Sequence, residues 1–175
     1  LFATLEITNR MKTLQINDIL KAWDDSITEQ YNHSLSQLDS RRDFLKQLLA
    51  GAAALTFSSS LLANQSGLDS ELWRSIAAVQ LHLLPPSDDA PDAASINAAS
   101  YLKSVLEWPG VDEADKKFIQ QGVGWLNAVA KKHYAKVFYL LDDPQKETVL
   151  RSIEKSQAGE NWLSLLLLYL MEALL

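Results

Sequence analysis

The sequence predicts an all-α fold, a small and irregular bundle of about five helices. Apolar residues beyond position 63 recur at steps of three and four, which is the spacing of one helix face. Capping residues, prolines and glycines divide this pattern into separate segments. No stretch alternates apolar and polar residues as a half-buried strand would, so we expect no sheet. The chain has 175 residues and no cysteine, so it must be held together by packing or by a partner.

The first two helices of the bundle are marked by an apolar stripe and by the residues around it. Pro85-Pro86 ends the first helix, and residues 87–94 form a loop. Ser95 can cap the second helix, which we expect at residues 96–107. The stripe of the first helix consists of Leu68, Leu72, Ile76, Val79 and Leu83.

The order of charges identifies the third and longest helix. Asp112 can cap it, and Lys131 and Lys132 near its far end match the helix dipole. Gly122 and Gly124 interrupt its apolar stripe, and each costs about 1 kcal/mol relative to alanine. We therefore expect these glycines to mark close packing against another helix. Residues 134–141 either continue this helix or form a separate turn.

Two further helices complete the predicted bundle. Asp143-Pro144 is typical of a helix start, and this helix should end near Ser156, where Ala158-Gly159 breaks it. The last helix, residues 162–175, is apolar on nearly every side but shorter than the roughly 20 residues of a membrane span. Such a helix is buried by other protein, so we expect either a C-terminally truncated chain or a helix that a partner covers.

A twin-arginine motif lies ahead of the bundle, and an uncharged apolar stretch follows it as far as Asn64. This combination is typical of a twin-arginine export signal, which a receptor reads as an address for folded proteins. The alternative is a chance Arg-Arg pair before an apolar helix. We expect an exported, periplasmic protein, in which Ala63 offers a cleavage site and an uncleaved anchor is the alternative. The motif consists of Ser40, Arg41, Arg42, Phe44, Leu45 and Lys46.

Three parts of the chain are therefore expected. Residues 1–39 form a leader, residues 40–63 the signal segment, and residues 64–175 the helical domain. A leader of this length is unusual, and Met11 is an alternative start. We expect the leader to be disordered, although a short amphipathic helix is the alternative. That helix would have on one side Ile16, Ile19, Leu20, Trp23 and Ile27.

Composition and motifs exclude several function classes. The net charge of −6 and the lack of a basic face argue against nucleic acid as a partner. The lack of cysteine excludes thiolate metal sites, cysteine nucleophiles and covalent haem attachment. There is no nucleophile elbow and no phosphate-binding glycine loop, so we expect no catalytic, cofactor-binding or metal-binding residues. Only His82 with Asp88 and Asp89 could bind a metal, and a helix-end histidine beside solvated acids is the simpler interpretation.

Four aromatic residues are candidates for a partner-binding surface, because tryptophan and tyrosine are enriched at interface hot spots. For the tryptophans the alternative is a place in the core. The four candidates are Trp108, Trp125, Trp162 and Tyr169.

Four segments behind the arginine motif carry a family resemblance, and they occur in order over about residues 68–175. They are residues 83–93 (LLPPSDDAPDA) with Tyr101-Leu102, residues 118–127 (FIQQGVGWLN), residues 138–141 (FYLL), and residues 159–164 (GENWLS) with Glu172–Leu175. Together they resemble the gluconate 2-dehydrogenase subunit 3 family. Members of that family usually continue past the position of Leu175, so we expect this chain to be incomplete there.

The resemblance implies a helical accessory subunit of a membrane-associated dehydrogenase complex. In that family the large subunit carries FAD and oxidises a sugar or sugar acid, and a membrane-bound multihaem cytochrome c accepts the electrons. The small subunit supplies the export signal for the twin-arginine machinery and stabilises the large subunit. The alternative from another class is a free-standing exported helical protein that binds a small ligand or a metal.

Overall fold

The computed structural model describes residues 15–26 and 68–175 of the chain. All regular structure within these ranges is helical, and they contain no strand, which confirms the predicted all-α fold. The export motif, the cleavage site at Ala63 and Met11 lie outside the described residues.

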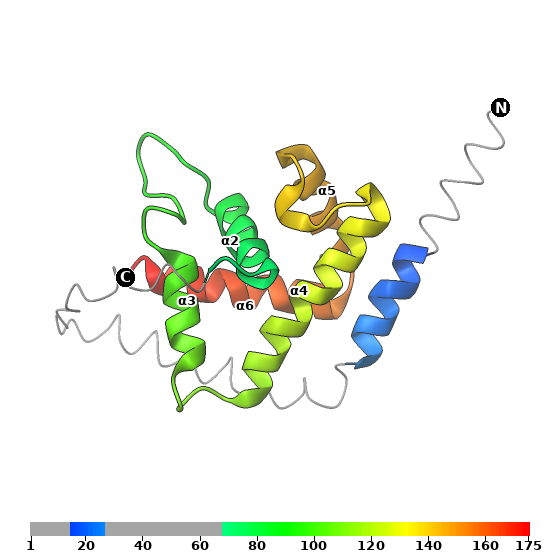
Figure 1. The fold of residues 1–175 in the computed structure, drawn as a ribbon, viewed down its shortest axis with the longest axis horizontal. Coiled ribbons are helices and arrows are strands. Elements are labelled where there is room, and N and C mark those ends of the chain that lie inside the picture. The colour runs from blue at the N-terminus through cyan, green and yellow to red at the C-terminus, as the bar shows by residue number, and fades with distance from the viewer. Residues whose placement is uncertain (1–14, 27–67) are drawn as a thin grey trace.

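Five α-helices and one 3₁₀ turn make up the body of the protein (Figure 1). A further helix at residues 15–26 lies beside α4, and we call it the N-terminal helix (blue in Figure 1). The elements of the body are α2 (Glu71–Leu83), α3 (Ala98–Glu107), α4 (Glu113–Tyr134), η3 (Phe138–Leu140), α5 (Asp143–Ile153) and α6 (Gln157–Ala173).

The long helix α4 lies at the centre of the bundle and packs against α2, α5 and α6. Helix α3 packs against α2 and α6, so that α6 also runs through the interior. Every helix contributes to one apolar core, because each buries one face against its neighbours. The largest fully buried side chains of this core include Trp23, Ile76, Phe138, Leu102, Ile119, Leu126, Ile153, Trp162, Leu166 and Tyr169.

Local side-chain bonds decide where the helices begin. Asp112 caps α4 as predicted, since its Oδ1 accepts the N–H of Ala114 at 2.8 Å. Helix α5 is capped one residue earlier than predicted: Asp142 Oδ1 accepts the N–H of Gln145 at 2.9 Å. The Gln145 side chain accepts the N–H of Asp142 in return at 3.3 Å, which completes a capping box.

The predicted start of the second helix is wrong by two residues. Ser95 does not cap α3, because its hydroxyl donates to the carbonyl of Asp92 at 2.8 Å within a turn. The Asp92 carboxylate also accepts the N–H of Ser95 at 2.6 Å. Helix α3 begins at Ala98, after Asn97 adopts a left-handed conformation with φ 53°. The turn competes successfully with the helix, as Ser and Asp side chains often do.

The predicted break at Ala158-Gly159 is also wrong, because both residues lie in the first turn of α6. Ser156 caps this helix by accepting the N–H of Gly159 at 3.0 Å. The separation between α5 and α6 therefore falls at residues 154–156. Of the two alternatives for residues 134–141 the separate turn is right, since α4 ends at Tyr134 and η3 follows.

The expectation of a disordered leader is wrong for residues 15–26. They form the amphipathic helix that was the alternative, with Ile16, Leu20 and Trp23 buried in the core of the body. Trp23 is fully buried in the folded protein. A leader that did not pack on the body would expose this large apolar side chain to water.

Candidate partner-binding surface

The four aromatic residues predicted for a partner surface have different environments. Trp162 and Tyr169 are buried in the core, so the partner-surface interpretation is wrong for both. The Trp162 indole N–H donates to the carbonyl of Ile119 at 3.1 Å, which satisfies its polar atom inside the protein. Trp125 is half-buried and stacks on Trp23, whereas Trp108 is 69% exposed. Only Trp108 is free to contact another protein with its whole ring.

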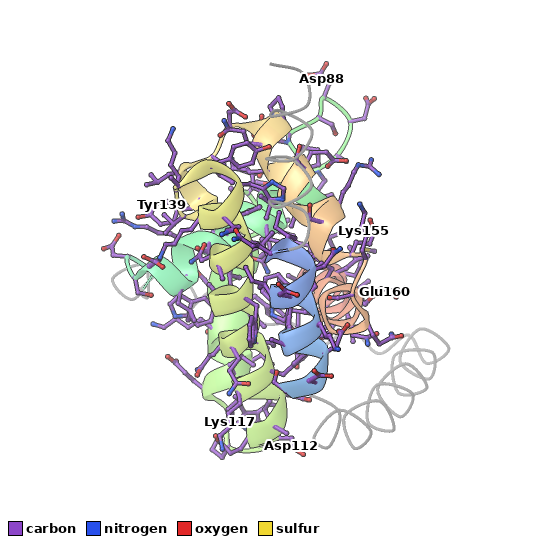
Figure 2. The ribbon with its side chains drawn as sticks, turned by 90° about the vertical axis from the view of Figure 1, so that its right-hand side faces the viewer. Asp88, Asp112, Lys117, Tyr139, Lys155 and Glu160 are labelled. Atoms are coloured by element: carbon purple, nitrogen blue, oxygen red, sulfur yellow. The ribbon has the colours of Figure 1, made fainter. Side chains whose placement is uncertain are left out.

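The His82 group does not form a metal site. His82 Nε2 lies 2.8 Å from Glu147 Oε2 on α5. Asp88 and Asp89 are exposed on the loop after α2, and Figure 2 shows Asp88 at the edge of the molecule. Among the described residues no group of three or more His, Cys, Asp or Glu side chains could hold a metal ion. Arg151 pairs with the other oxygen of Glu147 at 2.6 Å.

The contacts of Glu147 with His82 and Arg151 change the pKa of its carboxyl group. The hydrogen bond from His82, followed by the positive charge of Arg151, lowers the pKa of Glu147 below its usual value. The His82–Glu147 pair joins α2 to α5, because His82 lies on α2 whereas Glu147 and Arg151 both lie on α5. We therefore assign His82 to the packing of two helices.

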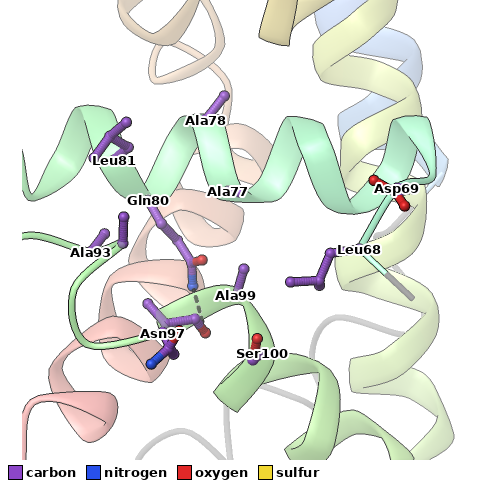
Figure 3. A pocket seen from close by; sticks show the side chains of 12 residues that line it. Leu68, Asp69, Ala77, Ala78, Gln80, Leu81, Ala93, Asn97, Ala99 and Ser100 are labelled. Carbon is purple, nitrogen blue, oxygen red and sulfur yellow. Dashed lines mark hydrogen bonds between the residues drawn. The ribbon is translucent and has the colours of Figure 1, made fainter. Parts of the chain in front are cut away.

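A hollow of about 440 Å³ opens between α2 and the start of α3 (Figure 3). Alanines make up much of its lining, and its one titratable residue is the exposed Asp69, which pairs with Arg74 at 3.6 Å. The buried Gln80 donates to the carbonyl of Ala98 at 3.5 Å, while its Oε1 has no partner. This lining supplies hydrogen-bonding groups, but its only acid is at a solvated position, which is a poor setting for proton transfer near neutral pH.

The clearest unpartnered apolar feature in the described part of the chain is the outer face of α6. Leu167 and Met171 lie one turn apart on this face and are 44% and 52% exposed, and Leu175, two residues past the end of the helix, is 86% exposed. We call these three residues the α6 stripe. Toward its N-terminal end the same face is polar, because its exposed residues there are Gln157, Glu160 and Ser164.

The chain itself buries the opposite face of α6, so only a narrow surface of this helix is left for a partner to cover. Seven residues of the helix are buried: Ala158, Gly159, Trp162, Leu165, Leu166, Tyr169 and Leu170. No helix among the described residues combines the length and the apolar character that a membrane crossing requires. An exposed row of large apolar side chains beside a polar row is typical of a protein-binding surface.

A partly buried hydrogen bond joins α3 to the end of α6 that carries the α6 stripe. The Tyr101 hydroxyl on α3 donates to Glu172 Oε2 at 3.3 Å, one residue from Met171. Burial, together with the charge of Glu172, raises the pKa of Tyr101 to about 12. The proton that this hydrogen bond needs is therefore retained even at alkaline pH.

Comparison with known proteins identifies the body as a family domain. The family model for gluconate 2-dehydrogenase subunit 3 matches residues 70–173, which is more than half of the chain. The match begins at the N-cap of α2 and ends with the last residue of α6, so it covers the helical body but not the N-terminal helix. No curated protein and no solved structure matches the chain significantly. The chain belongs to the gluconate 2-dehydrogenase subunit 3 family.

Proposed function

We propose that this chain is the non-catalytic small subunit of a periplasmic, membrane-associated dehydrogenase that oxidises a sugar or sugar acid. In this proposal FAD belongs to the large subunit, and haem c belongs to a cytochrome that passes electrons to the membrane. The chain supplies the twin-arginine export signal and stabilises the flavoprotein. The observation that carries the proposal is the family match over the whole helical body, because that family is named as a dehydrogenase subunit.

The α6 stripe gives this subunit a surface for the large subunit. Leu167 and Met171 project from one side of a helix whose other side is locked in the core, and Leu175 follows two residues past the end of that helix. Apolar side chains on a rigid element lose little conformational entropy on binding, so a partner that covers them gains affinity at low cost. The exposed Trp108, at the turn between α3 and α4, is a second candidate contact.

The export part of the proposal rests on the residues from Ser40 to Lys46 and on the uncharged stretch that follows. A pathway that carries folded proteins suits a helper whose partner must bind FAD before export. One signal on the small subunit is then sufficient for both chains.

The alternative of a free-standing metal-binding protein has less support. The only histidine near acids in the predicted group is paired with Glu147, and Arg151 holds the same carboxylate. A metal at His82 would have to displace this pair.

The decisive experiment is purification of the tagged chain from the periplasm of its own host, with its natural partners expressed. We expect a yellow flavoprotein to copurify with the wild type. With Arg41→Lys/Arg42→Lys, both proteins should remain in the cytoplasm. A wild-type chain that reaches the periplasm alone and binds no flavoprotein would overturn the proposal.

A second pair of variants tests the proposed contact surface. Leu167→Glu/Met171→Glu places two charges in the α6 stripe, and we expect it to lose the flavoprotein. The matched control Gln157→Glu/Ser164→Glu adds the same two charges at exposed positions on the polar part of that face. If both double variants bind the flavoprotein equally well, the large subunit does not dock on the stripe.

A further inference from the structure

The N-terminal helix lies in a groove that α4 and α6 form together. Figures 1 and 2 show this helix running alongside α4. Trp23 enters the groove fully buried and stacks on Trp125 of α4, with ring centroids 6.3 Å apart and an angle of 13° between the planes. It also meets Trp162 of α6 edge-on at 6.3 Å and 64°. Offset-stacked and edge-to-face pairs are the favoured arrangements of aromatic rings, so Trp23 makes favourable contacts with both rings.

A polar contact beside Trp23 fixes the position of the helix along the groove. Asp24 Oδ1 accepts the N–H of Ala158 at 2.8 Å, in the first turn of α6. The first N–H groups of a helix have no partner within the helix, and the positive end of its dipole favours a carboxylate. Ser156 satisfies the N–H of Gly159, and Asp24 supplies the acceptor for the neighbouring one.

The N-terminal helix has the two-faced pattern of a helix that recognises a groove. Ile16, Leu20 and Trp23 are buried, and they occupy positions i, i+4 and i+7. This spacing is the anchor pattern of helix-in-groove recognition. The opposite face is exposed at Gln15, Asn17, Asp18, Lys21, Ala22, Asp25 and Ser26.

The groove belongs to the family domain, whereas its occupant does not. The family match begins at residue 70, so Trp125, Trp162 and Ala158 lie inside it and residues 15–26 lie outside it. Without the N-terminal helix, the body would present two indole rings and an uncapped N–H side by side. That combination selects a short amphipathic helix with a tryptophan followed by an acid.

We propose that the groove between α4 and α6 is a helix-binding site for residues 15–26. The contacts described above hold this helix on the body even when the peptide chain that connects the two is cut. A protein cut between residues 27 and 67 then remains a complex of two pieces. The inference does not depend on the proposed dehydrogenase partner.

The test uses the full chain with a site for a sequence-specific protease, flanked by glycines, inserted between Asn32 and His33. An affinity tag at the N-terminus recovers the short piece after cutting, and mass spectrometry shows that cutting is complete. We expect the body to be recovered with the tagged piece through size-exclusion chromatography at micromolar concentration. Separation of the two pieces of the wild type, with the body still folded by circular dichroism, would overturn the proposal.

Three substitutions identify the contacts that hold the helix. Dilution of the cut protein gives the dissociation constant of the two pieces. We expect Asp24→Ala to raise it roughly five- to tenfold, as the loss of a helix cap would. Its control Asp25→Ala, at an exposed neighbour, should leave it unchanged. Trp23→Ala should raise it by more than about a hundredfold, with partial recovery in Trp23→Phe.

The outcomes remain distinguishable if Trp23→Ala fails to fold even when uncut. Asp24→Ala removes one acceptor at a half-buried position, so it tests the site without removing core volume. Equal dissociation constants for Asp24→Ala and Asp25→Ala would show that the carboxylate does not position the helix. The proposed recognition of the α6 N-terminus would then be wrong.

Discussion

At the scale of the single residue, Gly122 and Gly124 on α4 have opposite surroundings. A methyl group added at Gly122 would overlap the Trp162 indole, whose N–H is held by the carbonyl of Ile119. A methyl group at Gly124 would meet no atom within 4 Å. The expectation that glycines mark close helix packing is therefore right for Gly122 and wrong for Gly124.

This difference predicts opposite effects of the same substitution. Gly122→Ala should destabilise the protein by about 1–3 kcal/mol, because the indole must move out of a close-packed site. Gly124→Ala should stabilise it by about 0.5–1 kcal/mol, because alanine restricts the unfolded chain and suits an exposed helix position. Urea unfolding followed by circular dichroism measures both. A midpoint of Gly122→Ala at or above that of the wild type would contradict the packing at Trp162.

Asn127 shows how one side chain connects three elements. It is buried on α4, where its Oδ1 accepts the N–H of Phe138 in η3 at 2.9 Å and its Nδ2 donates to Glu71 of α2 at 3.0 Å. We expect Asn127→Ala to cost about 1–3 kcal/mol, because the buried N–H of Phe138 loses its acceptor. Gln120→Ala, at an exposed position of the same helix, is the control and should be close to neutral. Thermal unfolding of the two variants side by side provides the comparison.

At the scale of the element, the start of α5 depends on the capping box of Asp142 and Gln145. Asp142→Ala should cost about 1 kcal/mol, because it leaves the N–H of Gln145 without its acceptor. Asp143→Ala removes only an exposed pair with Lys146 and one first-turn charge, and should cost about 0.5 kcal/mol or less. Chemical denaturation of both variants decides between the two residues. Equal losses would show that the cap is not specific to Asp142.

The contact between α2 and α5 should depend on pH through Glu147. Its pKa is lowered in the folded state, so the stabilisation by His82 and Arg151 is fully present above the unfolded pKa of about 4.5 and is lost as the pH falls through the lower folded-state pKa. Glu147→Gln should therefore lower the melting temperature at pH 6, and this deficit should be smaller at pH 3. Glu154→Gln, at an exposed position just after α5, is the control and should show no such trend. A Glu147→Gln deficit that is the same at both pH values would refute this role.

Elements that depend on local signals were predicted well from the sequence, and those that depend on distant contacts were not. Asp112 and Pro85-Pro86 act on their immediate neighbours, so the ends of their helices could be predicted. The left-handed Asn97 results from a competing turn, which no helical pattern reveals. The place of Trp23 depends on rings more than a hundred residues away in the chain, so the sequence could only suggest an amphipathic helix without its partner.

At the scale of the whole molecule, the same limit applies to the partner surface. Helix α6 is apolar on nearly every side, so its sequence does not distinguish the face that the core buries from the face that remains exposed. Tyr169 was predicted for the surface and lies in the core, whereas Leu167 and Met171 remain outside. The packing of α6 against α3, α4 and the loop before α3 decides which of its faces is buried. This face can therefore be identified only once the fold is known.

The exposed α6 stripe predicts how the isolated protein behaves. Without a partner to cover Leu167 and Met171, we expect the chain to self-associate as its concentration rises. Leu167→Ser/Met171→Ser should shift it toward the monomer in sedimentation equilibrium. Leu140→Ser, a change at an exposed leucine in η3, is the control and should leave association unchanged. Association that is insensitive to the stripe variant would place the contact elsewhere.

The three indoles of Trp23, Trp125 and Trp162 also make the protein an optical reporter of its own assembly. Stacked and edge-on chromophores held in one fixed geometry couple their electronic transitions, and this coupling gives a near-ultraviolet circular dichroism band that mobile tryptophans lack. Because Trp23 comes from one segment and its two neighbours from another, the band depends on the docking of residues 15–26. The state of the groove can therefore be followed in unlabelled protein when the chain is cut or when a partner binds.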